Sequence, residues 1–134
     1  MRCVVDTNVI VSGLITESGN PRRVVDSILS RSLTVLFDDR ILGEYREVLR
    51  RPKFRLPSSE VEAFLAFVEE FGEYCSGHWI DVTLPDAADL PFLEVAVAGL
   101  ADALITGNAK HFRPKKGRHN VRIMTPAEFE RRAN

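Results

Sequence analysis

The chain has 134 residues, 45% of them hydrophobic and 28% charged, a composition typical of a globular domain rather than of a disordered or fibrous chain. Its apolar runs are far shorter than the ~20 residues that a membrane-spanning helix needs, so we expect no membrane segment. The formal net charge of −1 gives no overall attraction to nucleic acid, so nucleic-acid binding would depend on local clusters of Lys and Arg.

The first third of the chain is predicted to form a strand, helical segments and a second strand. Residues 3–5 and 33–37 are short apolar runs with the β-branched side chains typical of buried strands, and each ends at an aspartate. Between them, 9–14 and 24–29 have apolar side chains at helical spacing, and Pro21 is suited to the start of a helix. The pattern therefore predicts a β-α-β unit.

Two amphipathic helices are predicted in the middle of the chain. The first begins near Asp39 and ends before Pro52, because proline cannot continue a helix. The second covers 59–71, where Ser59 and Glu62 have the spacing of a capping box. Each has apolar side chains on one face, so we expect both to pack against the core.

The last third continues the alternation of strands and helices. We expect a short strand at 79–82, a buried helix over 89–100, strands at 103–106 and 121–124, and a terminal helix capped by 125–128. Alternating elements with nearly continuous apolar strands predict a three-layer α/β/α fold around a mostly parallel sheet of four or five strands. We expect one domain over 1–134.

The cellular compartment is predicted from the first residues and from the cysteines. The opening MRCVVD reaches an acid at position 6, so it lacks the longer apolar stretch of a signal peptide. Cys3 and Cys75 have no spacing typical of a metal site, and we expect both to be reduced and buried. These features favour a cytoplasmic protein.

Polar side chains fall where predicted strands end and helices begin. Asp6 follows the first strand, and Glu44 lies in the first turns of the helix after the second strand. Asp89 starts a later helix, and Asn108 follows the strand after it. Such positions meet at the carboxyl edge of a parallel sheet, where sites form in open α/β folds. Asp102 precedes its strand, so we expect it nearer the opposite edge.

Convergence of these acids predicts a divalent cation. Carboxylates within a few ångströms repel one another and take up protons unless a cation holds them ionised. The ligands would be hard oxygens without Cys or His, which favours Mg²⁺, or Mn²⁺, over zinc. Such an ion can activate water for attack on a phosphodiester, so we expect hydrolysis of that bond.

Three ordered motifs carry a resemblance to a known family. They are VVDTNVIVSG at 4–13, LGEYREVLRRPKF at 42–54 and DAADLPFLEVAVAGLADALITGN at 86–108. Together they resemble the PIN-domain nucleases, in particular the VapC-like toxin components of toxin–antitoxin pairs. The resemblance covers nearly the whole chain.

The resemblance implies a role for each matching position. It implies that Asp6, Glu44 and Asp89 are the acidic metal-site and catalytic residues, with Thr7 or Asn8 as the polar neighbour of the first acid. Asn108 stands where many members have a fourth acid, and we predict it as a fourth catalytic residue.

The departure at Asn108 affects the metal count, because an amide gives less charge to hold a second cation. The resemblance further implies cleavage of single-stranded RNA with Mg²⁺ or Mn²⁺, a homodimer and an antitoxin protein as partner.

Supporting residues are also predicted around this site, each with a structural alternative. Asp86 is either an outer ligand or a solvated loop acid, and Asp102 has a site role or a structural one. Thr106 either binds water or substrate phosphate or simply ends a strand. For contacts to RNA phosphates we predict the basic residues Arg46, Lys110, Lys115 and Lys116, whose alternative is a solvated surface.

Two other functions remain open from the residues. One is a PIN-like adaptor that binds RNA or protein without cleavage, an idea that only Asn108 supports. The other is a phosphotransfer domain with Asp6 as acceptor. Against the latter, Asn8 stands where phosphatases of the haloacid dehalogenase type have a second aspartate.

Overall fold

A computed structural model of the chain describes residues 1–133 and shows a five-stranded sheet in which every neighbouring pair of strands is parallel. The strand order is β3-β2-β1-β4-β5. The strands are β1 (Arg2–Val5), β2 (Thr34–Phe37), β3 (Glu73–Tyr74), β4 (Ala103–Ile105) and β5 (Ile123–Met124). The three-layer α/β/α architecture with a parallel sheet is thereby confirmed.

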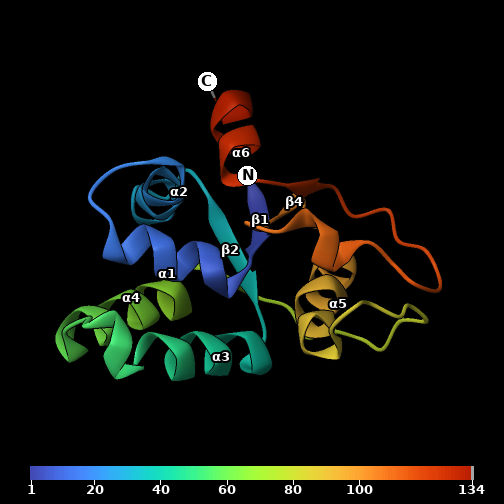
Figure 1. The fold of residues 1–134 in the computed structure, drawn as a ribbon, viewed down its shortest axis with the longest axis horizontal. Coiled ribbons are helices and arrows are strands. Elements are labelled where there is room, and N and C mark those ends of the chain that lie inside the picture. Colours follow the sequence, from blue (N-terminus) through green and yellow to red (C-terminus); the bar gives the residue numbers. More distant parts are fainter. Residues whose placement is uncertain (134) are drawn as a thin grey trace.

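Helices cover both sides of this sheet: α1 and α2 lie on one side and α5 on the other (Figure 1). The helices are α1 (Thr7–Ile15), α2 (Asn20–Leu29), α3 (Asp39–Leu49), α4 (Ser58–Phe71), α5 (Leu90–Ala98) and α6 (Pro126–Ala133). Three short 3₁₀ turns join them: η1 (Pro52–Phe54), η2 (Ala87–Asp89) and η3 (Ala109–Phe112). Among residues 1–133, no helix is both long and apolar enough to cross a membrane.

The register of the two central strands positions the polar residues that follow them. Residues 3–5 of β1 and all of β4 have 0% exposure, as expected for strands covered on both faces. Val5 pairs with Ile105, so the next residues of both strands, Asp6 and Thr106, leave the sheet side by side.

Of the two predicted helix caps, the one at α4 differs from the structure and the one at α6 agrees with it. The capping box at Ser59 is wrong, since α4 begins at Ser58 after Pro57 and has no side-chain cap. This earlier start places Ser59 inside the first turn. At α6 the cap is confirmed: Thr125 N–H donates to Glu128 at 3.1 Å, and Glu128 N–H donates to Thr125 Oγ1 at 3.2 Å.

The strand predicted at 79–82 is wrong. Trp79 is 80% exposed in a surface segment. The strand in this part of the chain is β3, which pairs with β2. The next residue to pair is Thr83, whose N–H donates to the Lys116 carbonyl at 2.9 Å in an isolated antiparallel bridge. Of the two cysteines, both free as predicted, Cys3 is buried and Cys75 only partly so.

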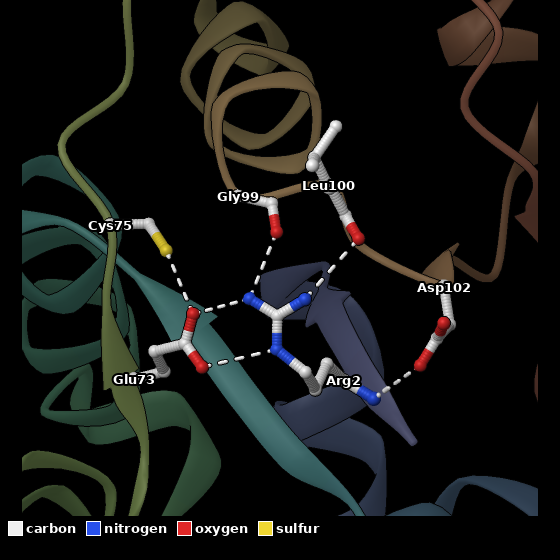
Figure 2. A network of polar contacts seen from close by, with 6 residues as sticks. All are labelled: Arg2, Glu73, Cys75, Gly99, Leu100 and Asp102. Carbon is white, nitrogen blue, oxygen red and sulfur yellow. Dashed lines mark hydrogen bonds and ion pairs between the residues drawn. The ribbon is translucent and has the colours of Figure 1, made fainter.

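One arginine ties together the amino edge of the sheet (Figure 2). Arg2 forms a two-pronged ion pair with Glu73 and donates to the carbonyls of Gly99 at 2.9 Å and Leu100 at 3.3 Å. The Arg2 backbone N–H donates to Asp102 Oδ2 at 2.8 Å. These contacts join β1 and β3 to the segment that follows α5.

We expect Arg2→Ala to lower the free energy of unfolding by about 1–3 kcal/mol, because it removes the Glu73 pair and leaves two carbonyls without their donor. Urea unfolding followed by circular dichroism measures this. Asp102→Asn is the control: the amide oxygen can still accept from the Arg2 backbone, so its loss should be smaller. An unchanged Arg2→Ala midpoint would show that the network does not stabilise the fold.

Candidate functional site

Asp6 is held at the carboxyl end of β1 by the neighbouring strand. Its N–H donates to the Ile105 carbonyl at 2.8 Å, and Thr106 Oγ1 donates to Asp6 Oδ2 at 2.8 Å. Asp6 is also the N-cap residue of α1, yet its side chain makes no capping hydrogen bond. Its carboxylate is therefore positioned by the hydroxyl of Thr106, which follows the neighbouring strand β4.

Glu44 reaches the same place from α3. That helix starts directly after β2, where the Asp38 carboxylate accepts from Ile41 N–H at 3.0 Å. In the second turn of α3, Glu44 is half-buried and accepts a hydrogen bond from the Thr7 hydroxyl. Its neighbour Tyr45 is fully buried and donates to the last carbonyl of β1, which fixes α3 against the sheet.

Asp89 comes from the turn before α5. Asp86 caps η2 by accepting from Ala88 N–H at 2.9 Å, whereas the Asp89 side chain makes no cap. The Asp89 side chain is 16% exposed, and its Oδ2 is the buried side-chain polar atom that has no hydrogen-bond partner among the described residues. The His111 imidazole lies beside this carboxylate, with Nδ1 3.6 Å from Asp89 Oδ2.

These side chains line one cavity of about 500 Å³ at the carboxyl edge of the sheet. The lining residues are Asp6, Thr7, Asn8, Val11, Ser12, Glu44, Val48, Arg51, Phe54, Asp86, Asp89 and His111. Its four acids are Asp6 after β1, Glu44 on α3, Asp86 in the loop before η2 and Asp89 at the end of η2.

Burial and mutual repulsion disfavour ionisation of the acids. Burial, and next the charge of Asp6, raise the pKa of Asp89 from 3.8 to about 6, against the lowering effect of His111. Burial also raises the pKa of Asp6 and of Glu44, although each accepts a hydroxyl hydrogen bond that lowers it. Three neighbouring carboxylates thus resist carrying full negative charge together.

This arrangement fits a divalent cation. Its donors are oxygens, one carboxylate oxygen has no partner among the described residues, and a bound positive charge would relieve the repulsion. Within residues 1–133, no three acidic, His or Cys side chains already lie close enough to surround one ion. Mg²⁺ commonly takes one or two direct carboxylates and completes its shell with water, so a preformed triple ligand set is not required.

Asn108 borders the cavity through a histidine. Its Nδ2 lies 3.0 Å from His111 Nε2, and its N–H donates to Thr106 Oγ1 at 3.1 Å. Asn8 is held by the residue before Asn108, since its Oδ1 accepts from Gly107 N–H at 3.3 Å. Both amides thus lie beside the acids and support the cavity walls.

Other predicted residues lie farther from the acids. Asp102 lies at the amino edge of the sheet, bonded to Arg2, as its position before β4 suggested (Figure 2). Arg46 faces α4, with Nη2 3.5 Å from Glu69. The three lysines predicted to contact phosphate are exposed. Lys110 lies on η3, and Lys115 and Lys116 lie on the segment that pairs with Thr83. Their contacts to phosphate stay predictions.

Six of the lining residues were not predicted as site residues: Val11, Ser12, Val48, Arg51, Phe54 and His111. His111 has no spacing typical of a metal ligand, although it follows Asn108 by one turn of η3. Arg51 and Phe54 come after α3 ends at Leu49, so helical spacing from Glu44 does not place them.

Comparison with known proteins shows a family and a likeness of fold. A family model described as the PIN domain matches residues 2–110. Among solved structures, a chain of VapBC2 from Rickettsia felis, crystallised with a DNA fragment from its promoter, has a TM-score of 0.57 and 16% sequence identity. The match covers 93% of this chain and 98% of that one, and at this identity it shows likeness of fold alone. No curated protein matches the chain.

We expect Asp89→Asn to stabilise the metal-free protein at pH 8. A carboxyl whose pKa is about 6 in the folded state and lower when unfolded costs stability above pH 6, and the cost disappears as the pH falls toward 4. With allowance for partial exposure, the gain at pH 8 should be about 1–2 kcal/mol.

Urea unfolding of both proteins in EDTA measures this gain, and the same comparison at pH 4 is the control because both side chains are then largely neutral. A variant less stable than the wild type at both pH values would contradict the repulsion described above.

Proposed function

Because the chain belongs to the PIN-domain family, we propose that the acidic cavity is the active site of a metal-dependent endoribonuclease that cleaves single-stranded RNA. Asp6, Glu44 and Asp89 line one cavity, and this observation supports the proposal. Among the described residues, the buried Oδ2 of Asp89 has no hydrogen-bond partner. A cavity with this donor set suits a cation and a phosphodiester better than an apolar ligand.

In this proposal Asp6, Glu44 and Asp89 hold Mg²⁺, or Mn²⁺. When bound, the ion supplies an acidified water and neutralises charge on the phosphate oxygens. Thr106 and Thr7 fix the carboxylates of the first two acids by hydrogen bonds, so that neither side chain must reorganise when substrate enters.

The remaining polar side chains have positioning roles in the proposal. Asn108 holds His111 at the cavity wall beside Asp89, where its imidazole can hydrogen-bond a phosphate oxygen. Asn8 lines the same wall. Asn108 adds no negative charge, so this acid set favours one tightly bound cation rather than two.

The biological setting is proposed from the likeness of fold to a chain of VapBC2. We infer a cytoplasmic toxin of a toxin–antitoxin pair that covers one domain over 1–134, forms a homodimer and is bound by an antitoxin protein. Isolation of the chain with the product of the adjacent gene would support this setting.

We expect purified protein to cleave end-labelled single-stranded RNA with Mg²⁺ or Mn²⁺ and not with EDTA. Asp6→Asn should reduce the rate about a hundredfold or more, because removing even an indirect metal-site contact often costs 10- to 100-fold. Gel analysis of initial rates measures the loss.

Asp102→Asn is the matched control, since it makes the same substitution at the opposite edge of the sheet and should cleave like the wild type. Equal cleavage by the wild type and Asp6→Asn would refute the proposed active site. Binding of RNA without any cleavage would favour an adaptor.

A further inference from the structure

The cavity continues away from the acids between two helices. α1 and α3 lie side by side (Figure 1), and Glu44, Val48 and Arg51 follow one another on the α3 side of the cavity. At a rise of about 1.5 Å per residue, Val48 lies roughly 6 Å beyond Glu44 along α3. Arg51 follows just after this helix ends at Leu49. On the α1 side the lining changes in the same direction, from Asn8 to Val11. The cavity therefore has an acidic end and an apolar end.

An aromatic ring closes the apolar end. After α3 the chain turns through η1 (Pro52–Phe54), which is followed by Arg55 in the left-handed conformation with φ 54°. This turn returns Phe54 to the cavity wall, where it is half-buried against the core. Lys53 places its ammonium group 5.1 Å from the centre of the Phe54 ring. The ring is thus held by a defined turn and has the Lys53 cation over one of its faces.

Arg51 is held in place beside this ring. Its Nη2 donates to both carboxylate oxygens of Glu47, at 3.1 and 3.0 Å, and its Nε donates to one of them at 3.4 Å. The Glu47 carboxylate offsets much of the Arg51 charge, which makes this arginine a weak site for a phosphate. A fixed guanidinium still offers a flat face and further N–H donors to a planar polar ligand.

The chemistry of the two ends selects different parts of a nucleotide. The apolar end offers Val11, Val48 and Phe54, which cannot pair with a phosphate but can cover the flat face of a base. Unpaired bases stack on aromatic rings and on arginine planes in single-stranded RNA recognition, whereas a base inside a duplex cannot be reached this way. A volume of about 500 Å³ lies within the range of small-ligand pockets, roughly 300–1,000 Å³.

We propose that the apolar end of the cavity is a nucleobase subsite in which Phe54 stacks on one unpaired base, next to the phosphate at the acids, and Arg51 contacts the edge of that base. The identity of the ligand as RNA rests on the proposed function. The subsite would make the chain selective for single strands and for the base beside the cut.

The test is a double-mutant cycle between the ring and the base. A fluorescein-labelled oligouridylate and an abasic ribose-phosphate oligomer of the same length are titrated with wild type, Phe54→Ala and Phe54→Leu, and binding is followed by fluorescence anisotropy with Ca²⁺ in place of Mg²⁺. We expect Phe54→Ala to weaken binding of the oligouridylate about tenfold and to leave binding of the abasic oligomer unchanged.

Phe54→Leu retains the apolar packing, so it separates loss of the ring from loss of the fold and should still bind the oligouridylate more weakly than the wild type does. Phe71→Ala, at a half-buried Phe of α4 outside this cavity, is the matched control and should bind both oligomers like the wild type.

Equal weakening for both oligomers, no weakening, or no measurable binding of oligouridylate by the wild type would overturn the subsite. Because binding is read without cleavage, an inactive protein whose binding depends on both Phe54 and the base would refute the nuclease and keep the subsite.

Discussion

The parallel pairing of β1 with β4 is the constraint on which the site depends. It places Asp6 beside Thr106 in a buried position, and the helices that follow the strands bring Glu44 and Asp89 to the same edge. The acids lie near one another because the pairing of the strands and the starts of the helices fix where their backbone atoms lie. Their repulsion is thereby built into the fold, and a bound cation is the direct way to relieve it.

The Arg2 network that stabilises the fold and the acidic cavity lie at opposite edges of the sheet. At the amino edge, Arg2 joins neighbouring elements through Glu73 and Asp102, so each charge there has an opposite or hydrogen-bonding partner (Figure 2). At the carboxyl edge, the buried acids repel one another and Asp89 keeps an oxygen that lacks a partner among the described residues. Native folds commonly retain such locally unfavourable groups at functional sites and gain their stability elsewhere.

Much of this arrangement could be predicted because it follows from strand ends and helix starts, which periodicity locates well. Asp6 and Asp89 belong to this class, and Asp102 was placed at the opposite edge by the same rule. His111 and Phe54 could not be placed, since short 3₁₀ turns determine their directions. The capping box at Ser59 failed because Pro57 starts α4 one residue earlier than expected.

If the acids at the carboxyl edge of the sheet form a cation site, a soaked metal ion should be found there. Anomalous diffraction from a crystal soaked in Mn²⁺ locates the ion without any assumption about substrate. We expect a peak about 2 Å from carboxylate oxygens of Asp6, Glu44 or Asp89. A peak confined to another part of the molecule, or none at a concentration that saturates binding in solution, would contradict the cation site.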